Sequence, residues 1–300
     1  MKFPSKLSPG DKVSIISPAS KIDRQIAERA ADLLRQQGFR VEIGLHALDI
    51  DGMFAGTDPE RAADMQKVLN DKSIKAVFFT RGGYGSIRTH QLINWSSFFK
   101  KPKWLIGFSD ITVFHAYLNR HSIASLHGVM TAWFEKDEIL TDSFLQMIAC
   151  LKGKTPEYVL PSHNLNRKGG SSGILTGGNL SIIQSLRGTP CDISPKGKIL
   201  FIEDINEHHY HLDRMMMNLK AGGVLEQLSG VIVGYFTGIK DGETVYGKTA
   251  VEIIHEAVST YHYPVVFGFP AGHEFPNYPL IMGSKISLEV TDDRVIIKTI

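Results

Sequence analysis

The sequence predicts an α/β protein whose first half forms a parallel sheet and whose second half forms a separate region. Three observations support this. In the first half, short and continuously apolar runs alternate with segments of helical periodicity, which is typical of strands buried on both faces. A polar segment over 156–172, rich in Pro, Asn, Lys, Gly and Ser, then interrupts the periodicity and predicts a linker. The length of 300 residues is sufficient for two domains.

The N-terminal elements alternate from the start of the chain. The run Lys12–Ile16 predicts a buried strand, and the segment Ile22–Gln37 has apolar residues at helical spacing and stops at Gly38. The same order continues with a strand over 39–43, a helix over 58–69 capped by Asp58 with Pro59 in its first turn, a strand over 74–79, a helix over 86–93, a strand over 104–106 and a helix over 113–118. Loops at the carboxyl ends of parallel strands build ligand sites, which places Arg81–Gly85 and Ser109 at such a site.

The region after the linker has a different pattern of predicted elements. Buried strands are predicted over 198–202 and 231–235, and helices over 212–221 and 249–259. The alternating segment 285–299 predicts a hairpin around Asp292 and Asp293. The predicted domains are therefore 1–155 and 173–300.

Composition excludes several classes of function. Lys and Arg exceed Asp and Glu by 33 − 31 = 2, which gives no strong field toward a nucleic acid or an anionic membrane. Two isolated cysteines support neither a disulfide framework nor a zinc ribbon and suit a reducing cytosol. The N-terminus lacks an apolar signal region, and no apolar run approaches the ~18 residues of a membrane helix. We therefore expect a cytoplasmic protein with no nucleic-acid or membrane partner.

The segment Gly107–Thr112 contains the first candidate catalytic residue. Ser109 follows the strand Trp104–Ile106 and precedes a helix. A serine at a strand-to-helix turn exposes its Oγ as a nucleophile, and the N–H of the next residue points toward a developing oxyanion. Ile111 occupies the position of the second glycine in the G-x-S-x-G pattern. On these residues alone, Ser109 as a helix N-cap remains the alternative.

A nucleophilic serine needs a base and an acid that orients the base. The strand over 199–202 ends at two carboxylates, Glu203 and Asp204, of which only one can face a site because side chains alternate along a strand. His273 lies in a Gly/Pro-rich loop after Val265 and Val266. The chain order Ser, Glu, His also occurs in α/β-hydrolases.

Other histidines and glycines are weaker candidates. His115 falls on the helix after the serine, where a packing role is favoured. The run His208–His211 lacks the H-E-x-x-H spacing of a zinc helix, so no metal site is predicted there. Gly82–Ser86 matches neither common nucleotide-binding glycine pattern, which makes phosphate binding the lesser interpretation.

The chain resembles the LD-carboxypeptidases, the serine peptidase family of muramoyltetrapeptide carboxypeptidase. The resemblance runs in family order from near residue 13 to near residue 285, and Tyr210–Arg214 also fits, with His211 in place of an expected Arg. The matching stretches are Arg81–Gly85, Gly107–Thr112, Leu126–Gly128, Thr176–Ser181, Leu186–Pro190, Leu200–Asp204 and Gly268–His273.

The resemblance implies a catalytic triad in which Ser109 is the nucleophile, His273 is the general base and acid, and Glu203 orients His273. It implies an oxyanion hole built from the N–H groups of Asp110 and Gly83. The implied fold is a Rossmann-like parallel-sheet N-terminal domain with a smaller β-rich C-terminal domain, and the triad forms across the cleft between them. The implied reaction is hydrolysis of the bond between an L-centre, lysine or diaminopimelate, and a terminal D-Ala in murein tetrapeptides, for peptidoglycan recycling, with no metal and no cofactor.

Four further residues are candidates for binding the murein peptide substrate. Arg81 is placed to bind a terminal carboxylate or to bridge loops, Tyr84 to cover the substrate or to pack as a loop aromatic, and His127 and Asn179 to line the site. Two alternatives remain open: a peptidase of the microcin-immunity branch that cleaves a peptide–nucleotide conjugate, and a non-catalytic Rossmann-type binding protein. A homodimer is also left open.

Overall fold

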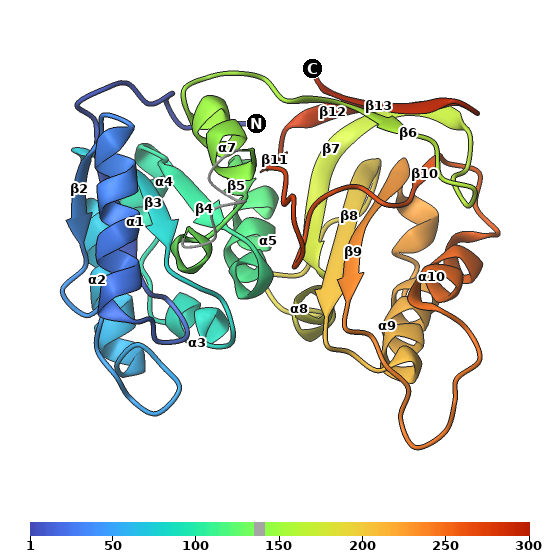
Figure 1. Ribbon diagram of the computed structural model, residues 1–300, viewed down its shortest axis with the longest axis horizontal. Helices are drawn as coiled ribbons and strands as arrows, with labels where there is room; N and C mark the ends of the chain where they lie inside the picture. The colour runs from blue at the N-terminus through green and yellow to red at the C-terminus, as the bar shows by residue number, and fades with distance from the viewer. Residues whose placement is uncertain (135–141) are drawn as a thin grey trace. The chain divides into compact units, whose positions relative to one another are not determined.

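A computed structural model describes residues 1–134 and 142–300 as two compact units (Figure 1). The first unit comprises Met1–Lys154 together with Tyr278–Ile281, and the second comprises Thr155–Asn277 together with Met282–Ile300. A short piece of the late chain therefore belongs to the first unit. Cys150 and Cys191 are both buried, and neither forms a disulfide.

A six-stranded sheet forms the centre of the first unit (Figure 1). The strand order is β11 (Leu280–Met282), β5 (Ser125–His127), β4 (Trp104–Gly107), β3 (Ile74–Phe79), β1 (Lys12–Ile16) and β2 (Arg40–Ile43). The strands pair in parallel from β5 through β4, β3 and β1 to β2, as the sequence predicts.

Helices connect these strands, and their aromatic residues fill the core beside β3 and β4. Phe79 of β3 stacks on Phe114 with ring centroids 5.3 Å apart, and Phe108 at the end of β4 is fully buried. This packing holds the turn after β4 on a rigid base. The helices are α1 (Arg24–Gln36), α2 (Asp58–Asn70), α3 (Ser86–Gln91), α4 (Ser96–Lys100), α5 (Thr112–Arg120) and α7 (Ser143–Leu151).

The start of α2 differs from the prediction by one residue. Thr57 is the N-cap, and its N–H and hydroxyl both donate to the Glu60 carboxylate at 2.8 Å. Asp58 therefore begins the helix instead of capping it, and its carboxylate pairs with Arg61 and Arg88. The capping box of Thr57 and Glu60 is favoured over Asp58 as the cap because both of its reciprocal hydrogen bonds are formed.

The second unit is built on a seven-stranded mixed sheet (Figure 1). Its strands β7 to β10 pair in parallel, whereas β7, β12, β13 and β6 pair antiparallel. The order is β10 (Val265–Val266), β9 (Gly230–Thr237), β8 (Lys198–Ile205), β7 (Gly169–Asn179), β12 (Lys285–Val290), β13 (Arg294–Thr299) and β6 (Glu157–Pro161), with helices α8 (Leu180–Ser185), α9 (His209–Ala221) and α10 (Ala250–Val258). The predicted hairpin over 285–299 is confirmed as β12 and β13.

The prediction of a linker over 156–172 is wrong for the residues of β6 and β7. Residues 157–161 pair with β13, and residues 169–172 pair with β12. β6 is an edge strand with mostly exposed side chains, and the start of β7 consists of Gly and Ser. Backbone pairing holds these segments in the sheet with few buried side chains, of which Tyr158 is one in β6, so the regular hydrophobic pattern that marks a strand is missing.

None of the helices in the part of the chain that the structure describes is long and apolar enough to cross a membrane.

Gly177 in β7 provides a test of the close packing of β7 against β8. Its φ is +117°, and a Cβ there would lie 1.9 Å from the carbonyl oxygen of Phe201 in β8. We expect Gly177→Ala to lower the free energy of unfolding by about 3 kcal/mol or more, because backbone must move and the residue is strained. Gly197→Ala is the control: its φ is also positive at +67°, but its Cβ would meet nothing within 4 Å. Urea unfolding compares the two, and equal losses would contradict the steric argument.

Candidate active site

Ser109 occupies a strained turn directly after β4. Its φ is +61°, in the left-handed region that residues other than glycine rarely adopt. Residues 109–111 form a 3-10 turn that leads into α5, and the side chain of Ser109 caps neither helix, since Phe108 and Ile111 are the N-cap residues. The N-cap interpretation is therefore wrong for this serine. Ser109 is half-buried. Its unfavourable backbone conformation is the geometry expected of a turn that presents a serine Oγ as a nucleophile.

The glycine loop after β3 lies directly against Ser109. A Cβ at Gly82 would lie 3.1 Å from Ser109 Oγ and 3.2 Å from the backbone nitrogen of Asp110. The buried Asp110 carboxylate accepts a hydrogen bond of 2.8 Å from the N–H of Ser86, at the end of this loop. Asp110 thus holds the loop beside the serine through its side chain. Gly83, the predicted oxyanion residue, has a φ of +91° and faces Ser20. The glycine whose Cβ would lie against Ser109 is Gly82, which the sequence did not indicate.

His115 supports the same turn from behind. Its Nε2 lies 2.8 Å from the Gly107 carbonyl oxygen, and its Nδ1 lies 2.8 Å from Ser125 Oγ. Because a carbonyl only accepts, Nε2–H donates to Gly107 and Nδ1 accepts from the Ser125 hydroxyl. Burial lowers the pKa of His115 to about 4, so the ring is neutral near pH 7. The predicted packing role of this histidine is confirmed.

His115 predicts a pH-dependent part of the stability. Its folded pKa of about 4 lies below the ordinary value of 6.5, so this stabilisation is complete above pH 6.5 and is lost as the pH falls toward 4. The difference corresponds to about 3 kcal/mol between the two limits. We expect the free energy of unfolding to fall less steeply between pH 7 and pH 5 in His115→Leu than in the unsubstituted protein. Urea unfolding at the two pH values measures this, and equal slopes would contradict it.

A histidine–carboxylate pair forms in the second unit. The Nδ1–H of His273 donates to Glu203 Oε2 at 2.7 Å, and the Glu203 side chain is fully buried at the end of β8. The neighbouring Gly272 has a φ of +130°, and a Cβ there would lie 3.0 Å from the same carboxylate oxygen. A glycine at 272 therefore allows the histidine loop to approach the carboxylate. Because Nδ1 carries the proton, Nε2 is the nitrogen left to accept one.

Asp204, the neighbour of Glu203, has a different role. Its carboxylate accepts from Asn179 Nδ2 at 2.9 Å and from the Ser181 N–H at 2.8 Å, at the start of α8. Burial and the adjacent Glu203 raise the pKa of Asp204 to about 7. The alternation of side chains along β8 thus gives one carboxylate to His273 and the other to the start of α8.

The predicted substrate-binding residues have varied surroundings. Arg81 is exposed, and Tyr84 is 45% exposed with its ring 6.0 Å from that of Phe54. His127 is fully buried at the end of β5, with its ring 5.7 Å from that of Phe108. Asn179 is the N-cap of α8 and accepts a hydrogen bond from the N–H of Ile182, which gives it a structural role.

The histidine run at the start of α9 does not converge on one point. His209 Nδ1 lies 2.9 Å from an Asp241 carboxylate oxygen, and His211 bonds to Glu207. Among the described residues, the group whose ligand atoms lie close enough to hold one ion is His46, Asp49 and Glu60. All three already have partners, since His46 binds Asp49 at 2.7 Å and Glu60 belongs to the cap of α2.

Comparison with known proteins assigns both halves of the chain. Residues 13–128 match the LD-carboxypeptidase N-terminal domain, and residues 172–288 match the LD-carboxypeptidase C-terminal domain. The chain belongs to the LD-carboxypeptidase family. This confirms the resemblance drawn from the seven stretches and identifies the chain as a member of a peptidase family.

Relatives within the LD-carboxypeptidase family match along nearly the whole chain. A probable murein peptide carboxypeptidase from Bacillus subtilis is 32% identical and covers 98% of this chain and 94% of its own length. A murein tetrapeptide carboxypeptidase from Pseudomonas aeruginosa is 28% identical, with 93% of each chain covered.

Solved structures share the fold of this chain. The muramoyltetrapeptide carboxypeptidase from Oxalobacter formigenes matches with a TM-score of 0.88 at 26% identity, over 96% of this chain and 98% of that one. The microcin C7 self-immunity protein MccF also matches with a TM-score of 0.88, over 99% and 98% of the two chains, but at 21% identity, which shows the fold alone. The predicted fold class, a Rossmann-like domain followed by a second domain with its own sheet, is confirmed.

Proposed function

We propose that this protein is a serine-type LD-carboxypeptidase that releases the terminal D-Ala from murein tetrapeptides during peptidoglycan recycling in the cytoplasm. The bond hydrolysed joins D-Ala to the L-centre of lysine or diaminopimelate. The observation that carries the proposal is the pair His273–Glu203 at 2.7 Å, combined with a serine at φ +61° beside a glycine loop. The peptidase relatives named above support the same reaction class.

The proposed reaction uses three side chains. Ser109 Oγ attacks the carbonyl carbon of the L-residue while His273 Nε2 takes the hydroxyl proton. His273 then gives that proton to the amine of D-Ala, which leaves, and an acyl-enzyme remains on Ser109. Water, activated by His273 in turn, releases the peptide. Glu203 keeps the proton on Nδ1 and stabilises the imidazolium that forms in each step. The proposal requires Ser109 Oγ and His273 Nε2 to meet in the working enzyme.

The oxyanion formed in each step needs hydrogen-bond donors. We assign this role to the backbone N–H groups of Asp110 and Gly83. A Cβ at Gly82 would crowd both Ser109 Oγ and the Asp110 nitrogen, so the glycine leaves room there for the carbonyl of the substrate. The hydrogen bond from Ser86 to the Asp110 carboxylate fixes these donors before the substrate arrives.

The microcin-immunity activity is the second candidate for this site. The chain shares the fold of MccF with a TM-score of 0.88, at 21% identity. The carboxypeptidase is the stronger candidate because relatives named for murein peptides reach 32% identity over almost the full chain.

Release of D-Ala from a panel of peptides tests the proposal. An exo-acting enzyme must bind the terminal carboxylate, for which the exposed Arg81 and the N–H groups of residues 82–85 are the candidates. A C-terminal amide leaves such donors unpaired at about 1–3 kcal/mol, so kcat/KM for the amide is expected to fall about 5- to 150-fold. The epimer ending in L-Ala is expected to resist hydrolysis. Equal rates for acid and amide would exclude carboxylate recognition, and equal rates for the epimers would exclude this activity.

A further inference from the structure

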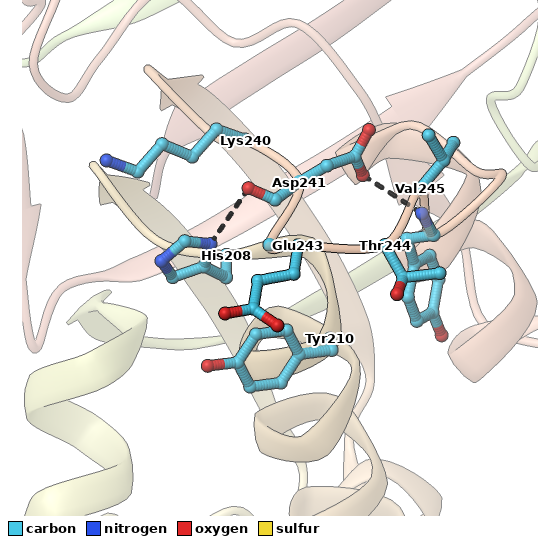
Figure 2. A pocket seen from close by; sticks show the side chains of 9 residues that line it. His208, Tyr210, Lys240, Asp241, Glu243, Thr244 and Val245 are labelled. Carbon is cyan, nitrogen blue, oxygen red and sulfur yellow. Dashed lines mark hydrogen bonds between the residues drawn. The ribbon is translucent and has the colours of Figure 1, made fainter.

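A concave site lies in the C-terminal unit, between the loop after β9 and the start of α9 (Figure 2). The cavity measures about 960 Å³, and we call it the β9 hollow. None of its residues takes part in the proposed chemistry. It is lined by His208, Tyr210, Lys240, Asp241, Gly242, Glu243, Thr244, Val245 and Tyr246.

The β9 hollow is attached to the strand ends that carry the His273–Glu203 pair. The N–H of Lys240 donates to the Glu207 carbonyl at 3.0 Å, four residues beyond Glu203. One strand over, Thr237 Oγ1 donates to Glu274, the residue after His273, at 2.9 Å. The hollow therefore shares the carboxyl edge of β8 and β9 with the proposed catalytic pair, the edge at which parallel sheets bind ligands (Figure 1).

Asp241 holds together the loop and the helix end that form the hollow. Its carboxylate accepts from the Tyr246 N–H at 3.1 Å and bonds to the His209 ring at 2.9 Å, while its carbonyl oxygen accepts from His208 Nδ1 at 3.2 Å. Figure 2 shows the carboxylate turned toward the far side of the loop, away from Glu243. Asp241 is thus committed to holding the loop on α9 and is not available to a ligand.

Two charged side chains of the hollow remain for a ligand. Lys240 and Glu243 are both exposed, and neither forms an ion pair with another described residue. In Figure 2 they lie on either side of the His208 ring. An ammonium and a carboxylate that are held in one cavity without pairing with each other suit a ligand that carries both charges itself.

We propose that the β9 hollow binds the side-chain end of a diaminopimelate residue, an inference that rests on the proposed function. That side chain ends in a carbon bearing both an ammonium and a carboxylate, which would pair with Glu243 and Lys240 respectively. Lysine ends in an ammonium alone and leaves Lys240 unpaired. Lys240 is then the residue that distinguishes diaminopimelate-type from lysine-type tetrapeptides.

The test measures kcat/KM for D-Ala release from diaminopimelate-type and lysine-type tetrapeptides. In Lys240→Gln we expect about a 3- to 10-fold loss on the diaminopimelate peptide, the range of exposed to partly desolvated charge pairs, and no loss on the lysine peptide. Glu243→Gln is expected to lower both, because both peptides carry the ammonium. Lys196→Gln is the matched control, since Lys196 is exposed in the loop before β8, at the opposite end of that strand. Equal losses on both peptides with Lys240→Gln, or no loss on either, would overturn the inference.

A binding measurement separates this inference from the proposed function. If the unsubstituted protein releases no D-Ala from either peptide, the proposed function fails. The hollow is then tested by calorimetric titration of Ser109→Ala protein with uncleaved diaminopimelate tetrapeptide, with and without Lys240→Gln. Weaker binding in the double variant supports the hollow, and unchanged binding overturns it.

Discussion

Replacing Ser109 by alanine is expected to lower kcat for D-Ala release by about four orders of magnitude or more. The alanine retains the turn but removes the oxygen that forms the acyl-enzyme. His273→Ala should cost a similar factor, because the serine is then left without a base. The double variant should be little worse than either single variant, since the members of a triad act as one unit.

Two controls make this result interpretable. Ser97→Ala removes a hydroxyl from an exposed serine of α4 and should leave kcat unchanged. Unfolding curves should show that Ser109→Ala is folded, so that the loss of kcat reports on the missing hydroxyl. Turnover of Ser109→Ala near that of the unsubstituted protein would end the proposal of a serine nucleophile.

The position of Ser109 could be predicted because the signal is local. An apolar strand, a turn and a helix follow one another within Trp104–Leu118, and the structure places β4 and α5 there. What the sequence could not supply was the conformation of the turn. Whether a serine caps a helix or sits at φ +61° depends on the packing of Phe108 and on the support of the Gly107 carbonyl by His115.

The choice between Glu203 and Asp204 shows a second limit. Alternation along a strand predicts that the two carboxylates face different neighbours, but it does not say which one meets the histidine. That depends on β7, whose Asn179 pairs with Glu203 in register and brings Ser181 to Asp204. Such a contact between strands is long-range and leaves no mark in the local pattern.

The segments that were missed share a physical cause. The strands β6 and β7 begin among polar and small residues, and backbone pairing with β12 and β13 holds them. The β9 hollow was missed because most of its residues, 240–246, lie in a loop with no periodicity. Its shape comes from the bonds of Asp241 to α9 and to the loop itself. In both cases hydrogen bonding defines the structure, whereas sequence patterns report mainly on burial.

Replacing Glu203 by glutamine is expected to lower kcat by about 10²- to 10⁴-fold, less than the loss in Ser109→Ala. Glutamine is close to glutamate in shape and fits the fully buried site, but it removes the charge that stabilises the imidazolium of His273. Its amide also presents either an oxygen or an NH₂ group to Nδ1, so the tautomer with a free Nε2 is no longer enforced. Oxygen Oε2 of Glu203, at 2.7 Å from Nδ1, is the atom on which this expectation rests.

Asp204→Asn is the matched variant, because it changes the adjacent buried carboxylate that does not bond to His273. Its oxygens accept from Asn179, Ser181 and Ile205, so its loss should appear in stability, at about 1–3 kcal/mol, and only weakly in kcat. Steady-state kinetics with urea unfolding on both variants therefore gives opposite patterns: a large kcat loss with little destabilisation for Glu203→Gln, and the reverse for Asp204→Asn. If Glu203→Gln retains kcat within a few-fold while Asp204→Asn abolishes it, the orienting carboxylate is Asp204, and the pair seen in the structure is not the catalytic one.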